Sequence, residues 1–258
     1  MRDVQSELDE RNIPLLKVGV SDITYPIRVM DRADGYQTTV SKISMFVNLP
    51  HEFRGTHMSR FVEVLNRHRT NMTLGNLEAI LDEMKVSLNA QTAHIEVRFP
   101  YFILKEAPVS KIASFMDYEC VFFGSKGETF DFLLEVNVPV HSLCPCSKEI
   151  SDFGAHNQRG NVKIQVRMKR LIWIEEIVEV AEKSASAPLY SLLKREDEKY
   201  VTEKAYMNPK FVEDIVRDVS IELAKDERIT YYSVEAKNFE SIHNHNAYAF
   251  TEFDRRNL

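Results

Sequence analysis

The order in which strand and helix patterns follow one another is the feature that most constrains this fold. Residues 18–30 and 38–48 have the alternation of strands, and two stretches with apolar residues at helical spacing follow them. Strands at 93–104 and 114–123 close the first half, and the second half repeats this order from a strand at 129–138. A twofold β-β-α-α-β-β order predicts an α+β protein with antiparallel sheets, each carrying a helix pair on one face.

The helix patterns define the middle of each half. In the first half, apolar residues recur at helical spacing from Phe61 to His68 and again from Leu77 to Met84. In the second half, we expect one helix over 172–184, ended by Ala187-Pro188, and a second from Asn208-Pro209 to about Lys225. Two strands, at 229–237 and 247–251, then finish the chain.

These patterns predict a bimodular chain. Residues 1–16 are charged and polar and are expected to form a solvated leader, followed by a first module over 17–126 and a second over 127–258. Pro26 favours an edge position for the first strand, because proline cannot donate a hydrogen bond to a neighbouring strand. Long strands with exposed ends also favour closure of the sheets by other subunits, so we expect a homo-oligomer.

Composition excludes several classes of protein. An apolar content of 44% is enough for a full core, and the net charge of −6 gives no global attraction for nucleic acid. No apolar run reaches the roughly 20 residues of a membrane span, and the N-terminus has no signal-peptide core. Three cysteines, two of them separated only by a proline, do not form a secreted disulfide framework. We therefore expect a cytoplasmic protein that binds neither nucleic acid nor membranes.

The segment HSLCPCSKEISDFGAHNQRG carries the clearest chemical signal, because it places Cys144, Cys146 and His156 in one polar stretch between strands. Thiolate and imidazole together indicate either a metal site or an activated nucleophile. In a strand-like conformation, residues two apart point the same way, so both sulfurs are expected to face one pocket. Cys120 lies on an apolar strand and is expected in the core, and His141 is left without a role.

Two segments can supply a carboxylate to such a site. Residues 194–214 alternate acidic and basic side chains, a pattern typical of a solvated helix face, and Glu213 falls in the first turn of the last long helix. Residues 239–246 place Glu240 beside His243 and His245 in a polar loop. Cysteine, histidine and one carboxylate would leave an open coordination position, as in a catalytic zinc site.

An anionic substrate would require three or four basic residues to converge in one pocket. The candidates fall into two groups. They are Arg54, Arg60, Arg67, His68 and Arg69 in the first half, and Lys148, Arg159, Lys194, Arg195 and Lys199 in the second.

The chain resembles the prokaryotic type IB GTP cyclohydrolases. The resemblance rests on the cysteine-containing segment, on DEKYVTEKAYMNPKFVED and FESIHNHNAYA, and on RGTHMSRFVEVLN at 54–66, and it spans essentially the whole chain. It implies the tunnelling fold, a bimodular unit of β-β-α-α-β-β repeats, assembled as a homotetramer with sites between subunits. The implied reaction converts GTP and water to 7,8-dihydroneopterin triphosphate and formate, the entry to tetrahydrofolate and in some organisms to 7-deazapurines.

The same resemblance implies roles for individual residues. A divalent metal (zinc, manganese or iron) would be held by Cys144, His156 and Glu198. Glu240 and His243 would act at the metal or on the substrate, and Cys146 would act beside the metal in ring opening. Glu213 would anchor guanine, because a carboxylate can accept hydrogen bonds from N1–H and the 2-amino group together.

Three alternatives remain open at this point. The first is another tunnelling-fold purine or pterin enzyme, such as a nitrile reductase, which uses a cysteine nucleophile and no metal. The second is a GTP cyclohydrolase that releases a cyclic phosphate, as archaeal relatives do. The third is a non-catalytic protein with a structural metal, for which a closed site of four ligands is expected.

Overall fold

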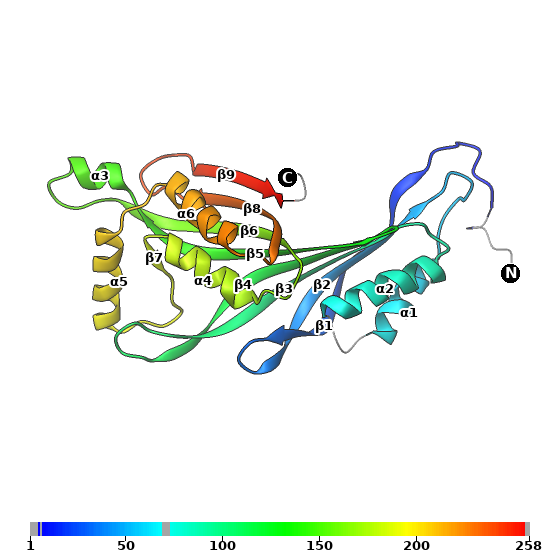
Figure 1. Ribbon diagram of the computed structural model, residues 1–258, viewed down its shortest axis with the longest axis horizontal. Coiled ribbons are helices and arrows are strands. Elements are labelled where there is room, and N and C mark those ends of the chain that lie inside the picture. Colours follow the sequence, from blue (N-terminus) through cyan, green and yellow to red (C-terminus); the bar gives the residue numbers. More distant parts are fainter. Residues whose placement is uncertain (1–4, 6, 69–72, 256–258) are drawn as a thin grey trace. The chain divides into compact units, whose positions relative to one another are not determined.

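The computed structural model describes residue 5, residues 7–68 and residues 73–255. Contacts divide the chain into two compact units, Met1–Pro100 with Val121–Leu134, and Tyr101–Cys120 with Glu135–Leu258. We call them unit 1 and unit 2. Three strands contribute residues to both units, so each unit is described by itself. Figure 1 labels the elements.

Unit 1 is built on strands in the order β1-β2-β3-β4-β5. Their bounds are β1 (Leu15–Asp31), β2 (Gly35–Leu49), β3 (Ala93–Glu106), β4 (Ala113–Lys126) and β5 (Phe130–Leu143). The first two pairings are antiparallel. Between β2 and β3 the chain forms two helices, α1 (Met58–Arg67) and α2 (Leu74–Ser87).

The core of unit 1 follows the apolar pattern of the sequence. Alternate residues of β2, from Ile43 to Leu49, are buried, and α2 buries Leu77, Ile80 and Met84 completely. β1 stands at the end of the strand order, and Pro26 lies opposite Val40 of β2. The expected edge position of the first strand is therefore confirmed.

Unit 2 continues the strand order as β3-β4-β5-β6-β8-β9, and β7 pairs with β5. The further strands are β6 (Asn157–Met168), β7 (Ala187–Pro188), β8 (Ile229–Asn238) and β9 (Ala247–Asp254). The helices are α3 (Pro145–Ile150), α4 (Ile174–Ser184), α5 (Arg195–Met207) and α6 (Val212–Lys225). β6 with β8, and β8 with β9, are antiparallel.

Helices α4 and α6 lie next to each other, and α6 packs on β8 and β9 (Figure 1). The residues at this contact are fully buried on both sides, for example Ile215 and Val219 of α6 and Val234 of β8. Cys120 of β4 is also fully buried, as expected, and burial raises the pKa of its thiol. The α+β class is confirmed.

Three local features differ from the sequence-based expectations. The charged segment after residue 194 forms a helix of its own, α5. The last long helix begins at Val212 and not at Asn208-Pro209, because Lys210 uses its backbone N–H to donate to the carbonyl of Leu143 (3.1 Å). Ala187-Pro188 does follow α4, but it forms β7 by pairing with His141 and Val140.

Within the part of the chain that the structure describes, no helix has both the length and the apolar character that crossing a membrane requires.

Candidate active site

The cysteine connection, which we define as residues 144–156, joins β5 to β6. Cys144 is extended (φ −71°, ψ 120°), and helix α3 begins at Pro145. Cys146 therefore lies in a helical turn, where side chains two residues apart point in diverging directions. The strand-like conformation on which the expectation of a shared pocket for both sulfurs depended is therefore absent at Cys146. Both thiols are free, and Cys144 is half-buried whereas Cys146 is exposed.

Hydrogen bonds close the cysteine connection at its base. The backbone N–H of Cys144 donates to the carbonyl of His156 (3.1 Å). The hydroxyl of Ser147 donates to the carbonyl of Cys144 (3.2 Å) and accepts from the backbone N–H of His156 (3.1 Å). Cys144 and His156 are thus held as neighbours although twelve positions separate them in sequence.

The histidine connection, residues 239–246 between β8 and β9, meets this base. The backbone N–H of Phe239 donates to the carbonyl of Arg159 (2.9 Å). Glu240 Oε2 then lies 3.9 Å from His156 Nδ1, and the two side chains are only 10% and 12% exposed. The ring of His243 stands edge-on to that of His156, with centroids 6.3 Å apart, and stacks on His245 at 5.1 Å.

The structure also brings in Gln158, a residue to which the sequence analysis gave no role. Its side chain is buried, its Oε1 lies 3.0 Å from His156 Nδ1, and its Nε2 lies 3.4 Å from Glu240 Oε1. The signal that could have found it is its spacing of two from His156, which places both on one face if the strand extends that far. β6 begins at Asn157, earlier than the strand expected from Asn161.

A series of buried hydrogen bonds holds the end of β5, where the cysteine connection begins. Asn238 Nδ2 donates to the hydroxyl of Ser142 (3.0 Å), which donates to the carbonyl of Lys210 (3.2 Å). The N–H of Lys210 donates to Leu143, the residue before Cys144. Gly160 is required beside these bonds, since a Cβ there would come within 2.5 Å of Asn238 Oδ1. The start of α6 is thereby fixed to the end of β5.

Two of the predicted acidic residues lie apart from this cluster. Glu213 is exposed in the first turn of α6, in an open hollow of about 490 Å³ that Arg217 and Phe250 of β9 also line. Glu198 is exposed near the start of α5. The other end of α5 meets the cysteine connection, where Lys148 Nζ donates to the carbonyl of Tyr206 (2.6 Å). Glu198 lies about 12 Å before Tyr206 along the helix at 1.5 Å per residue.

We asked whether the described residues can hold a metal. No three histidine, cysteine, aspartate or glutamate side chains in the described ranges lie close enough together to do so. The donor types of Cys144 and His156 nevertheless fit a divalent metal, because a thiolate and an imidazole held as neighbours are zinc-type ligands. One chain therefore offers two donors of the kind that a metal site uses, but no third beside them within the described ranges.

Several of the predicted basic residues pair with carboxylates of the same chain. Arg54 pairs with Glu7 (3.1 Å), and Arg67 and His68 both contact Glu83. Lys199 pairs with Glu203 on the surface of α5 (3.8 Å). Arg69 lies outside the described residues. In the described ranges, the side chains without a carboxylate partner include Arg60, Arg159, Lys194 and Arg195.

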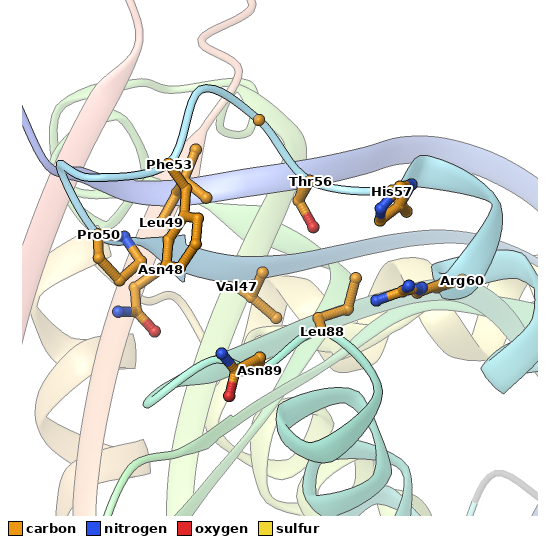
Figure 2. Close-up of a pocket in the computed structure, with 11 residues that line it drawn as sticks. Val47, Asn48, Leu49, Pro50, Phe53, Thr56, His57, Arg60, Leu88 and Asn89 are labelled. Carbon is orange, nitrogen blue, oxygen red and sulfur yellow. The ribbon is translucent and has the colours of Figure 1, made fainter. Parts of the chain in front are cut away.

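Arg60 belongs to a separate pocket of unit 1 (Figure 2). This pocket has a volume of about 140 Å³ and opens where the chain enters α1. Arg60 Nη1 donates to the carbonyl of Ser87 at the end of α2 (2.9 Å). Gly55, Thr56 and His57, from the family motif that begins at Arg54, line the pocket, and Thr56 is 91% buried. The lining residues are Val47, Asn48, Leu49, Pro50, Phe53, Gly55, Thr56, His57, Arg60, Leu88 and Asn89.

Comparison with solved structures identifies the fold. The chain is similar to uricase from Arthrobacter globiformis, with a TM-score of 0.54, 7% identity and 94% of each chain covered. It is also similar to a urate oxidase of Bacillus sp. TB-90, with a TM-score of 0.57, 9% identity, and 95% of this chain and 100% of that chain covered. At such low identity these likenesses show the fold alone. It is the tunnelling fold expected from the sequence.

Comparison with protein families gives a match over residues 1–249 to the family described as "Type I GTP cyclohydrolase folE2". GTP cyclohydrolase FolE2 of Geobacter sulfurreducens is 58% identical over 256 residues, covering 99% of both chains. The protein of that name from Kosmotoga olearia is 57% identical over 252 residues, covering 98% of both. The resemblance stated from the sequence motifs is confirmed, and the chain belongs to the type I GTP cyclohydrolase FolE2 family.

Proposed function

We propose that this protein hydrolyses GTP at C8 of guanine, giving formate and 7,8-dihydroneopterin triphosphate for tetrahydrofolate synthesis. The observation that carries the proposal is the closed base of the cysteine connection, which holds Cys144 beside His156 and Glu240 in a chain of this family. Thiolate, imidazole and carboxylate are the groups that a metal-assisted hydrolysis needs.

Cys144 and His156 would hold a divalent metal, zinc, manganese or iron, and Glu198 would complete the set. Bound there, the metal would act as a Lewis acid and would lower the pKa of a coordinated water. Glu198 is exposed, and in the described ranges it has no cationic partner, which leaves its carboxylate available. Because α5 meets the cysteine connection at its far end, we propose that Glu198 reaches the site of a neighbouring subunit in a homotetramer.

The remaining residues would bind substrate and move protons. The Glu240 side chain, only 10% exposed and 3.9 Å from His156 Nδ1, would accept a proton during the attack on C8. The ring of His243 lies edge-on to that of His156, and His243 can exchange protons with solvent because its loop is exposed. Cys146, exposed on α3, is available to the opening imidazole ring, as the family resemblance implies.

Binding of GTP would use the two ends of the nucleotide. Glu213 lines a hollow with Phe250, so a purine there can stack on an aromatic ring while its N1–H and 2-amino groups donate to the carboxylate. Arg159, Lys194 and Arg195 have no carboxylate partner in the part of the chain described, and they are the cations we assign to the triphosphate.

The test is incubation of the purified protein with GTP. Formate release and pterin fluorescence should appear, disappear when a chelator removes the metal, and return when zinc, manganese or iron is restored. Absence of formate with every metal would contradict the proposal. Activity that survives the chelator but is lost on alkylation of Cys146 would favour a metal-free cysteine enzyme.

A further inference from the structure

Gln158 is the buried polar side chain that joins the cysteine connection to the histidine connection. It is 7% exposed and lies near the start of β6. One end of its amide faces the ring of His156, with Oε1 and Nδ1 3.0 Å apart. The other end faces Glu240, with Nε2 and Oε1 3.4 Å apart. A single amide thus contacts both His156, the proposed metal ligand, and Glu240, the proposed proton acceptor.

The hydrogen-bonding chemistry of Glu240 and His156 determines which end of the Gln158 amide faces which residue. A carboxylate only accepts hydrogen bonds, so the NH₂ group of Gln158 must face Glu240. The amide oxygen must then face His156, and an oxygen can pair with a ring nitrogen only if that nitrogen carries a hydrogen. The hydrogen of the neutral imidazole is therefore on Nδ1, and the lone pair is on Nε2.

Other contacts agree with this orientation. The hydroxyl of Ser241 lies 3.5 Å from His156 Nδ1, which is longer than the contact with Gln158, and a hydroxyl can accept from an N–H as well as donate. The backbone on both sides is held independently, by the bond from Cys144 to His156 and by the bond from Phe239 to Arg159. The amide therefore acts on side-chain orientation and is not needed to hold the strands.

We propose that Gln158 is a positioning residue: it holds His156 with the hydrogen on Nδ1, so that Nε2 is the metal donor, and it holds Glu240 beside the ring. The inference rests on the proposed function, in which His156 is a metal ligand. Metal-binding histidines commonly donate their second ring N–H to an oxygen, and loss of that partner weakens metal binding about 10–100-fold.

Gln165 provides a matched control on the same strand. Its Nε2 donates to Glu135 (2.7 Å) and its Oε1 accepts from Ser233 (3.1 Å), so it also bridges a carboxylate and a second polar group. Gln165→Met and Gln158→Met remove an equivalent amide from β6. Gln158→Glu keeps an oxygen toward His156 but gives up the donor to Glu240 and places two carboxylates side by side.

The first measurement is the ¹⁵N spectrum of His156 in the metal-free protein, at a pH where the ring is neutral. We expect hydrogen on Nδ1 in the native protein, in Gln165→Met and in Gln158→Glu, and a shift toward the Nε2–H form in Gln158→Met. Signals of His156 are assigned by their loss in a His156→Gln protein. Hydrogen on Nε2 in the native protein, or an unchanged spectrum in Gln158→Met, would overturn the proposal.

The second measurement is zinc affinity by competition with a chelator. Gln158→Met should bind zinc about 10–100-fold more weakly, Gln158→Glu should recover part of this loss, and Gln165→Met should stay within about twofold of native. Equal losses in Gln158→Met and Gln165→Met would reduce Gln158 to a structural residue. If the native protein binds no metal, the proposed function fails, whereas the ¹⁵N spectrum still decides the role of Gln158.

Discussion

The two halves of the chain follow the same order of strands and helices, but their connections differ. In the first half, residues 32–34 join β1 to β2 and residues 107–112 join β3 to β4. The corresponding connections of the second half are the cysteine connection and the histidine connection, and both are longer. The second half also inserts β7 and α5 between its paired helices, where only residues 68–73 separate α1 from α2 in the first half.

The residues that we assign to metal binding and proton transfer follow this difference. Cys144, Cys146 and His156 lie in one of the longer connections, Glu240 and His243 lie in the other, and Glu198 lies on the inserted helix α5. The shared strands and helices carry the apolar core. This division is what is expected when a rigid scaffold is kept and its connections are elaborated for function.

The largest effect is expected from the ligands of the cysteine connection. Cys144→Ala or His156→Ala should lower metal affinity and formate production more than 100-fold, because loss of a ligand exceeds the 10–100-fold cost of losing a ligand's partner. Asp34→Ala, in the exposed first-half connection 32–34, is the control. Its metal affinity and formate production should stay within about twofold of native. Full metal occupancy in Cys144→Ala would contradict the assignment of metal binding to the longer connections of the second half.

The next effect concerns α5, which has no counterpart in the first half. Cys144→Ala and Glu198→Ala proteins should each be inactive, whereas subunits mixed by unfolding and reassembly should regain activity. A mixed assembly can combine the intact Cys144 of one chain with the intact Glu198 of another. The measurement is formate release before and after mixing. If mixing restores nothing, Glu198 acts with the Cys144 of its own chain.

A smaller effect is expected at the contact between the cysteine connection and α5. Lys148 Nζ donates to the carbonyl of Tyr206 and lies 4.4 Å from the centre of its ring. In Lys148→Met, the backbone amides of residue 148 and of Ser151, which follows α3, should exchange with solvent about fivefold faster, since one hydrogen bond is worth ~1 kcal/mol. Lys199→Met removes only a surface pair and should change nothing. Equal exchange rates would mean that α3 is held by its own backbone bonds.

The smallest expected effect lies where a short first-half connection meets α5. Asp197 is completely buried and accepts hydrogen bonds from the N–H groups of Val109 (2.8 Å), Ser110 (2.9 Å) and Lys194 (2.9 Å). Burial opposes ionisation, but these bonds and the hydroxyl of Ser110 outweigh it and hold the pKa of Asp197 below its ordinary value. Its contribution to stability is therefore present above the unfolded pKa and is lost as pH falls.

Asp197→Asn should accordingly unfold at lower urea concentration near pH 7. The difference from native should shrink as pH falls to and below about 3.9, the ordinary pKa of aspartate. Asp214 is a matched control, because it accepts from Phe211 at the start of α6 without reaching another segment. A difference for Asp197→Asn that does not change with pH would show that the carboxylate charge is not what stabilises this contact.

Much of the scaffold could be predicted from the sequence, because the burial of apolar side chains produces an alternating pattern in strands and a three-to-four-residue spacing in helices. The alternation from Val18 to Met30 and the helical spacing from Leu77 to Met84 both correspond to observed elements. The charge alternation of residues 194–214 was typical of a solvated helix face, but α5 was not among the expected elements, because it is held by contacts such as that of Asp197 and not by an apolar stripe. The helix after Cys144 was missed because a six-residue turn leaves no periodic signal.

The site could be predicted only in part. The family motifs pointed to Cys144, His156 and Glu240, which the structure brings together. The backbone bond between Cys144 and His156 is accompanied by two hydrogen bonds of Ser147, a residue with no chemical signal of its own. Gln158 was missed because an amide neither binds a metal nor titrates, and its importance follows only from what lies on either side of it.

We expect Cys144 to hold the metal while Cys146 stays free. X-ray absorption of the zinc-loaded protein tests it most directly, since zinc–sulfur and zinc–nitrogen distances of about 2.3 Å and about 2.0–2.1 Å are resolved. We expect one sulfur neighbour in the native protein and in Cys146→Ala, and none in Cys144→Ala. Two sulfur neighbours in the native protein, or one that persists in Cys144→Ala, would contradict the account.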